Sequence, residues 1–317
     1  MNNIKYSYMD HWEIQTPQGI NKPFIRRSYM ERYLKQVAAL GFEGLDTFAF
    51  YMPLYARMFG GSFKDFEKYL QDIGIGKVSG LFNCYLGDDK AFNPQDPSCH
   101  DAILNDFRMY SEMAKGTGVE TFIYMPAPMY YVLEPVTDEK VHHLADLANK
   151  VGKMVLEDYG IHLSCHHEFW CGLREKEWID KFYEWTDPKY VFFFCDTAQH
   201  SIAGLDPVAL YNQLADRTWG FHLKDTRNTD DTYYRIPPDT EIMVPDVPRW
   251  FYEAGSGKGL VDFPALFEAI KKNNYSGWIS VEHDKADLEG KSFSDCTGVS
   301  RWYIDHVLNP ILEKGDM

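Results

Sequence analysis

Four apolar runs in the second half of the chain are followed directly by residues that can bind a metal or move a proton. The first run continues into His166 and Glu168, the second into Asp196, the third into His222 and the fourth into Glu282. An ionisable side chain at the end of an apolar strand is costly to bury without a partner. If the four strands are neighbours, the three carboxylates repel one another, and a bound cation would relieve that repulsion.

The mixture of imidazole and carboxylate groups indicates which cation fits. Mn²⁺, Zn²⁺, Co²⁺ and Fe²⁺ accept both nitrogen and oxygen ligands, whereas Mg²⁺ prefers oxygen. We therefore expect a divalent metal cofactor, with Mn²⁺ as the first choice and the other four ions, Mg²⁺ included, as alternatives.

Eight short apolar runs, rich in Val, Ile, Phe and Tyr, predict strands that are buried on both faces. They are Ile4–Tyr8, Gly44–Phe50, Lys77–Asn83, Thr121–Met125, His162–His166, Val191–Cys195, Gly220–Leu223 and Trp278–Glu282. Helical patterns alternate with them, and several begin with a capping signal: Ser28 with Glu31, Ser62, Asp138, Asp206 before a proline, and Asp262.

This alternation predicts an α/β protein with a single (β/α)₈ TIM-barrel domain over residues 1–317. After the seventh strand, residues 226–259 form a long, proline- and aromatic-rich insertion. Such a long connection is typical of an active-site lid or a surface for another subunit.

The composition of the chain indicates which kinds of binding partner to expect and in which cellular compartment. The chain has 317 residues and a net charge of −15, which disfavours nucleic-acid binding. No apolar stretch of 18 residues and no secretory signal is visible, so we expect no membrane association. The six cysteines form no CxxC pair, which predicts reduced thiols and a cytoplasmic location.

Four motifs resemble the xylose-isomerase-like superfamily of sugar phosphate isomerases and epimerases, which includes inosose dehydratases, 3-dehydroshikimate dehydratases and ketose 3-epimerases. They are CDTAQHSIAGLDP, GFHLKDT, GSGKGLVDFPAL and GWISVEHD, and the resemblance is strongest over residues 160–285. It implies the same barrel, a divalent metal and a small keto-sugar substrate. A similar large subunit occurs in C-glycoside deglycosidases, which work with a small partner subunit; a homo-oligomer is the other possibility for assembly.

The resemblance also implies roles for individual residues. The metal ligands fall on Asp196, His222, Glu282 and one residue at the end of the fifth predicted strand, where the sequence reads SCHHE (residues 164–168). His166 and Glu168 lie on the same face of that strand, so one is expected to bind the metal and the other to act as the general base. The spacing from His166 to Asp196 is slightly more similar to the family pattern.

The remaining roles concern the substrate. Lys224, on the same face as His222, is expected to stabilise an oxyanion or orient a hydroxyl. The alternative is a structural ion pair with Asp225 or another carboxylate. Gln199 stands where many relatives have a substrate-binding histidine, with His200 beside it, and we expect both of them, together with His167 and Trp12, to contact substrate.

The chemistry implied is removal of a proton next to a carbonyl, with a divalent cation stabilising the enediolate and a carboxylate or imidazole as base. The sequence His166-His167-Glu168 is similar to the corresponding motif of inosose dehydratases, and this similarity favours β-elimination. The elimination would be either inosose-type dehydration or cleavage of a 3-oxo-glucosyl C-glycoside. A sugar isomerase or ketose 3-epimerase is the main alternative. An AP-endonuclease-like phosphodiesterase and a non-catalytic barrel subunit are alternatives of other classes.

Overall fold

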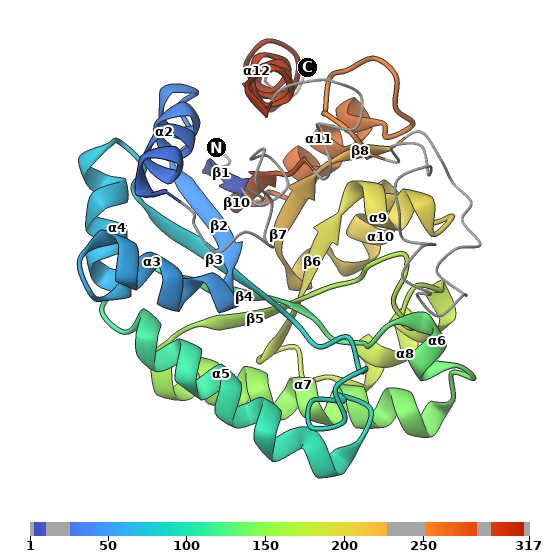
Figure 1. The fold of residues 1–317 in the computed structure, drawn as a ribbon. Coiled ribbons are helices and arrows are strands. Elements are labelled where there is room, and N and C mark those ends of the chain that lie inside the picture. Colours follow the sequence, from blue (N-terminus) through green and yellow to red (C-terminus); the bar gives the residue numbers. More distant parts are fainter. Residues whose placement is uncertain (1–2, 11–25, 227–250, 284–292, 314–317) are drawn as a thin grey trace.

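Eight parallel strands close into a barrel in the computed structural model, which describes residues 3–10, 26–226, 251–283 and 293–313 (Figure 1). The barrel strands are β1 (Ile4–Met9), β2 (Gly44–Phe48), β3 (Lys77–Cys84), β4 (Thr121–Met125), β5 (His162–His166), β6 (Val191–Asp196), β7 (Thr218–Leu223) and β10 (Gly277–Val281). Their order around the barrel is β1-β10-β7-β6-β5-β4-β3-β2, so the fold is the predicted TIM barrel.

The predicted strands agree with the observed ones to within two residues at each end, and the largest differences are at Phe48 and Thr218. The agreement has a physical reason: strands covered by helices on one side and by the barrel interior on the other read as unbroken apolar runs.

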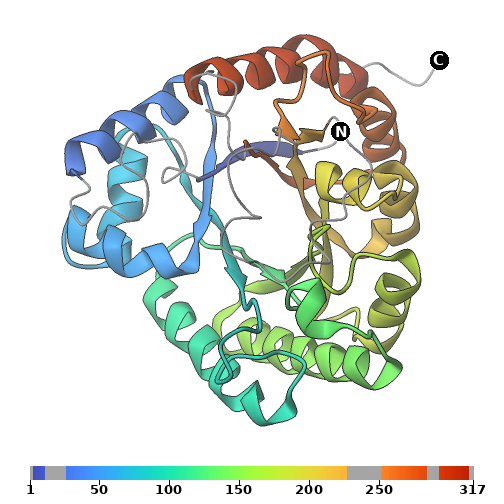
Figure 2. The ribbon, with the colours of Figure 1, turned by 45° about the vertical axis from the view of Figure 1, so that its right-hand side comes forward.

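An outer ring of helices covers the barrel (Figure 2). The helices are α2 (Arg27–Ala39), α3 (Met52–Phe59), α4 (Phe63–Asp72), α5 (His100–Ala114), α6 (Tyr130–Leu133), α7 (Asp138–Tyr159), α8 (Lys176–Trp185), α9 (Thr197–Ile202), α10 (Pro207–Leu214), α11 (Phe263–Lys272), α12 (Phe293–Tyr303) and α13 (Asn309–Glu313). Within the described ranges, no helix combines the length and apolarity needed to cross a bilayer.

The observed N-cap residues can be compared with the predicted ones helix by helix. Ser62 caps α4 as predicted and, together with Asp65, forms a capping box that the sequence analysis did not predict. Asp206 and Asp262 cap α10 and α11 as predicted. The predicted cap at Asp138 is wrong, because Asp138 is already the first residue of α7 and Thr137 caps the helix. The predicted cap at Ser28 is also wrong. Helix α2 already includes Arg27, and the residue before it caps with no side-chain hydrogen bond, so Ser28 lies inside the first turn.

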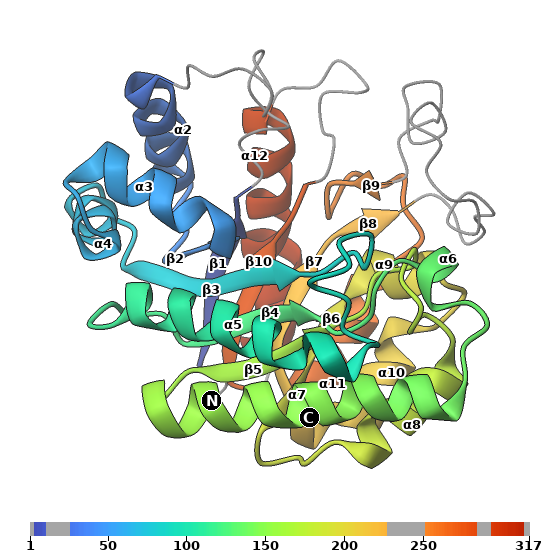
Figure 3. The same ribbon diagram turned by 60° about the horizontal axis from the view of Figure 1, so that its bottom comes forward.

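The insertion after β7 leaves and rejoins the described chain through a small antiparallel sheet. Its strands are β8 (Asp225–Thr226) and β9 (Phe251–Tyr252), and they lie at the end of the barrel where the strands terminate (Figure 3). Asp225 Oδ1 also accepts a hydrogen bond from the Val261 backbone at 3.0 Å. A Cβ atom at position 259 would collide with this carboxyl group, which explains the glycine there. Residues 227–250 of the predicted insertion lie outside the described residues.

Candidate metal centre and active site

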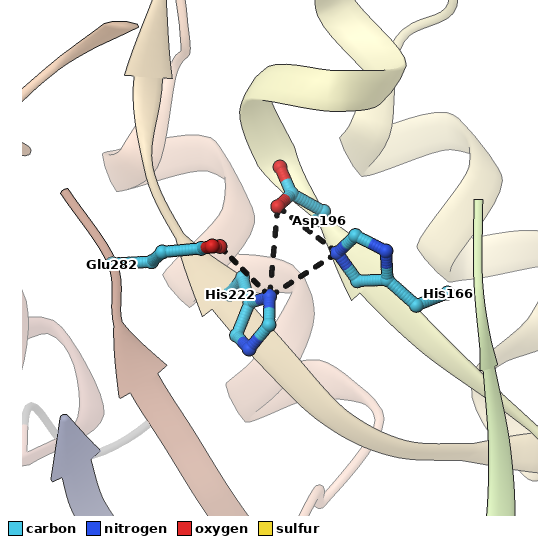
Figure 4. A group of neighbouring side chains, drawn as sticks. All are labelled: His166, Asp196, His222 and Glu282. Atoms are coloured by element: carbon cyan, nitrogen blue, oxygen red, sulfur yellow. Dashed lines mark hydrogen bonds and ion pairs between the residues drawn. The ribbon is translucent and has the colours of Figure 1, made fainter. Parts of the chain in front are cut away.

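Four buried side chains from four adjacent strands converge at the carboxyl end of the barrel (Figure 4). His166 ends β5, Asp196 ends β6, His222 lies near the end of β7, and Glu282 follows β10. One potential ligand atom from each residue lies within 4.8 Å of the other three. This end of a TIM barrel carries the active site in this class of fold.

The orientation of the His166 ring distinguishes its position from that of Glu168. The sequence alone did not indicate which of the two residues lies in the cluster. His166 Nε2 lies 3.1 Å from Asp196 Oδ2 and 3.1 Å from His222 Nδ1. Its other nitrogen, Nδ1, lies 3.4 Å from Glu168 Oε1. The histidine therefore faces the cluster, and the glutamate lies behind it at the barrel mouth.

Lys224 neutralises much of the cluster's negative charge. Its Nζ atom lies 3.1 Å from Asp196 Oδ2 and 2.8 Å from Glu282 Oε2, and the side chain is fully buried. Burial alone would raise the pKa of Asp196, but Lys224 and the two imidazoles outweigh it and hold that pKa well below its usual range.

The two histidines differ in charge state. Burial would lower the pKa of His222, but the carboxylates of Glu282 and Asp196 raise it to about 9. His222 Nδ1 lies only 2.9 Å from Glu282 Oε2. Burial lowers the pKa of His166, so this ring is neutral near pH 7 and has a nitrogen lone pair to offer.

The donor set fits a divalent transition metal. Two imidazole nitrogens and two carboxylates are a ligand combination that such ions accept. Because a histidine ligand must be deprotonated to bind metal, an ion bound here would displace the proton that the raised pKa of His222 favours.

Asp196 is held rigidly by the start of α9. Its Oδ1 atom accepts hydrogen bonds from the backbone N–H groups of Ala198 at 2.9 Å and Gln199 at 2.8 Å, which leaves Oδ2 for the cluster. Thr197, which the sequence analysis missed, accepts a hydrogen bond from the Lys224 backbone N–H at 3.0 Å and donates to the Lys224 carbonyl at 2.6 Å. A hydroxyl residue directly after a strand-end aspartate was the available signal.

The predicted substrate contacts do not all lie at the cluster. His167 is directed toward α8, with Nε2 3.1 Å from the Tyr183 hydroxyl, and His200 packs against Phe193 with ring centroids 5.5 Å apart. Gln199 Oε1 accepts a hydrogen bond from the backbone N–H of Phe169 at 3.2 Å. Trp12 lies outside the described residues.

Comparison with known proteins agrees with this geometry. Residues 34–295 match the family model described as xylose isomerase-like TIM barrel. The inosose dehydratase of Bacillus velezensis is 25% identical over 289 residues, covering 88% of this chain and 89% of that protein. The inosose dehydratase of Clostridium beijerinckii is 32% identical over 148 residues, about half of each chain (47% and 48%).

Solved structures show the same fold at low sequence identity. The IolI protein, solved with a bound zinc atom, has a TM-score of 0.71 at 16% identity, covering 98% of this chain and 100% of that one. The probable 3-DHS dehydratase AsbF of Bacillus anthracis has a TM-score of 0.68 at 11% identity, covering 96% and 99%. With the matching family model, the closed barrel and the clustered strand ends, the chain belongs to the xylose isomerase-like TIM barrel family.

Proposed function

We propose that this protein is a divalent-metal-dependent lyase that removes the proton next to a carbonyl in a keto-sugar or cyclitol and then eliminates a β-substituent. The observation that carries the proposal is the convergence of four buried metal-binding side chains from four adjacent strands. The match to inosose dehydratases supports elimination as the second step.

The proposed ligands are His166 through Nε2, His222 through Nδ1, and the carboxylates of Asp196 and Glu282. Mn²⁺ is our first choice of ion, and Zn²⁺ is the principal alternative because the similar IolI structure holds zinc. These four residues would hold the ion, which would supply Lewis-acid stabilisation of the substrate carbonyl.

Glu168 is the proposed general base. It lies beside the cluster without belonging to it, and its Oε1 atom is 3.4 Å from His166 Nδ1. It accepts the proton from the α-carbon as that C–H bond breaks. The protonated carboxyl is then the acid available to the leaving group, which departs with the proton as the new double bond forms.

Lys224 is the proposed oxyanion stabiliser. Its ammonium group is buried, is 2.8 Å from Glu282, and lies 4.6 Å from the centroid of the Phe251 ring. A fixed positive charge in a water-poor site favours the developing enolate oxygen. His167 is directed away from the cluster, so we expect it to fix β5 against α8 without contacting substrate.

A row of aromatic side chains beside His166 supports our choice of substrates to test. There, Phe82 lies edge-on to the His166 ring at 5.3 Å, Phe48 lies 5.3 Å from Phe82, and the half-exposed Phe50 lies 5.0 Å from Phe48. Aromatic rings next to a polar cluster suit a substrate that carries an apolar or aryl group on a polar ring. We therefore place 3-oxo-glucosyl C-glycosides beside inososes as substrates to test, with a small partner subunit as a further component.

Proton NMR in D₂O tests the reaction directly. The purified protein, loaded with Mn²⁺ or Zn²⁺, is incubated with inososes and with 3-oxo-glucosides, and a chelator is added to a parallel sample. We expect a new unsaturated or cleaved product that the chelator abolishes. Deuterium exchange into unchanged substrate or its epimer would instead identify an isomerase or epimerase. Absence of both metal binding and turnover would identify a non-catalytic barrel.

A pair of substitutions tests the assignment of His166 and Glu168. Glu168→Gln should retain metal at the wild-type stoichiometry and lose turnover by about 10²–10⁴-fold, the usual contribution of a general base. His166→Gln should lose metal and turnover together. The reverse pattern would make Glu168 the ligand.

A further inference from the structure

Asp46 of β2 is a further buried ionisable side chain, and it has no role in the proposed reaction. It is only 2% exposed. Ser7 of β1 donates a hydrogen bond to its Oδ2 atom at 3.1 Å, and Ser79 of β3 donates to its Oδ1 atom at 2.6 Å. TIM-barrel interiors are usually filled with bulky branched side chains, so a carboxyl group held by serines from the two neighbouring strands is unusual.

The Asp46 carboxyl group interacts electrostatically with groups on β7 and β10. Burial raises its pKa, while Ser79, the charge of His222, and the hydroxyls of Ser280 and Ser7 favour its ionised form. Ser280 of β10 is the register partner of His222 on β7. The carboxyl group, the Ser280 hydroxyl and the His222 ring therefore belong to one polar patch in the barrel interior.

The His222 ring has one nitrogen on each side of this arrangement. Nδ1 faces the other three cluster residues, and Nε2 points away from them (Figure 4). Both His222 Nε2 and the Ser280 hydroxyl oxygen are buried and have no hydrogen-bond partner among the described residues. Two buried polar atoms without partners, on residues that face each other in the register of β7 and β10, are the natural candidates to hydrogen-bond to each other.

We propose that Asp46 is a positioning residue for the metal centre: through the Ser280 hydroxyl it holds His222 by Nε2–H, so that Nδ1 is presented to the ion. Serine suits this link because its hydroxyl donates to the carboxylate and accepts from the imidazole. Metal-binding histidines generally give their second N–H to such a partner, which fixes the tautomer and the ring orientation. The inference rests on the proposed metal centre and adds a residue from the opposite side of the barrel.

Zinc affinity, measured by competition with a chromophoric chelator, tests the proposal. Asp46→Asn keeps the size of the side chain and removes its charge, and we expect a loss of affinity of about 10–100-fold. Ser280→Ala, which breaks the link and leaves the carboxylate, should also weaken binding.

Glu67→Gln is the matched control. Glu67 is a buried carboxylate that accepts hydrogen bonds from the Gly118 backbone at 2.8 and 3.0 Å, and it takes no part in the cluster. This variant should lower Tm and leave zinc affinity unchanged.

The outcomes separate this inference from the proposed function. If wild type binds zinc and Asp46→Asn binds it equally tightly, with only a lower Tm, Asp46 is structural and the inference is wrong. If wild type binds no zinc, the metal centre itself fails and the inference fails with it. Should Asp46→Asn not fold, Ser280→Ala decides. In that variant the Nε2–H signal of His222 in the zinc-loaded protein, observed by ¹H–¹⁵N NMR, should shift or exchange faster; an unchanged signal together with unchanged affinity overturns the inference.

Discussion

Replacing Lys224 by methionine should strongly destabilise the metal-free protein, and added metal should recover part of the loss. In the metal-free cluster, the buried ammonium group is 3.1 Å from Asp196 and 2.8 Å from Glu282. Methionine has a similar volume and no charge. The substitution therefore leaves two buried carboxylates with only the protonated His222 to balance them.

The expected magnitude follows from this geometry. Removing one partner of a buried ion pair costs roughly 3–5 kcal/mol, because an uncompensated charge remains. For a chain of this size the free-energy change corresponds to a decrease in Tm of roughly 5–12 °C. The loss should be smaller at low pH, where one carboxylate can take up a proton instead of remaining charged.

Thermal unfolding with and without saturating Zn²⁺ measures the effect. A divalent ion supplies the positive charge that the variant lacks, so Zn²⁺ should raise Tm more in Lys224→Met than in wild type. Lys77→Met is the matched control. Lys77 pairs with Glu120 at 2.6 Å, but both side chains are about one-third exposed, so its loss should cost about 1 kcal/mol or less.

Two results would refute this reasoning. A metal-free Lys224→Met protein as stable as Lys77→Met would mean that the buried lysine does not compensate the carboxylates. An equal increase in Tm on adding Zn²⁺ to both wild type and Lys224→Met would mean that the ion does not bind where the lysine charge is missing.

Three further predictions concern the ligands, pH and helix capping. Asp196→Asn should abolish stoichiometric metal binding, as measured by elemental analysis. His222 has its pKa raised from 6.5 to about 9, so its contribution to the stability of the metal-free protein is present below pH 6.5 and disappears as the pH rises through 9. Over the same range zinc affinity should increase, by about tenfold per pH unit below pH 9, because one proton is released; calorimetry in buffers of different ionisation enthalpy detects that proton. Ser62→Ala should cost about 1 kcal/mol by denaturant unfolding, whereas Ser28→Ala should have little effect, since only Ser62 caps a helix.

The sequence was sufficient for the barrel because each strand is an apolar run with a clear end. The same ends also indicated Asp196, His222 and Glu282, since an ionisable residue at the end of a buried strand is conspicuous. The predicted cap at Ser28 was wrong because a serine followed three residues later by a glutamate also occurs inside helices, as it does here in the first turn of α2. The first residue of a helix also depends on the backbone conformation of the residues before it, and here Arg26 is extended and Arg27 is already helical.

The residues at the end of β5 show more clearly what could not be predicted from the sequence. Strand alternation correctly separated His167 from His166, but His166 and Glu168 share a face, and alternation cannot rank two residues on one face. Their order came from ring orientation, with Nε2 toward Asp196 and Nδ1 toward Glu168. Asp46 was equally inaccessible, because its neighbours come from β1, β3 and β10 and meet only when the barrel closes.

The charges of the cluster connect folding to the proposed chemistry. In the metal-free protein, Asp196 and Glu282 are balanced by Lys224 and the protonated His222, so the barrel can fold without leaving an uncompensated buried charge. Exchanging the His222 proton for a divalent ion adds one net positive charge to the same set of residues. A site that is neutral without the ion and positive with it attracts an anion more strongly in the loaded state, as the proposed enediolate chemistry requires. The same lysine that stabilises the metal-free fold then supports the proposed reaction.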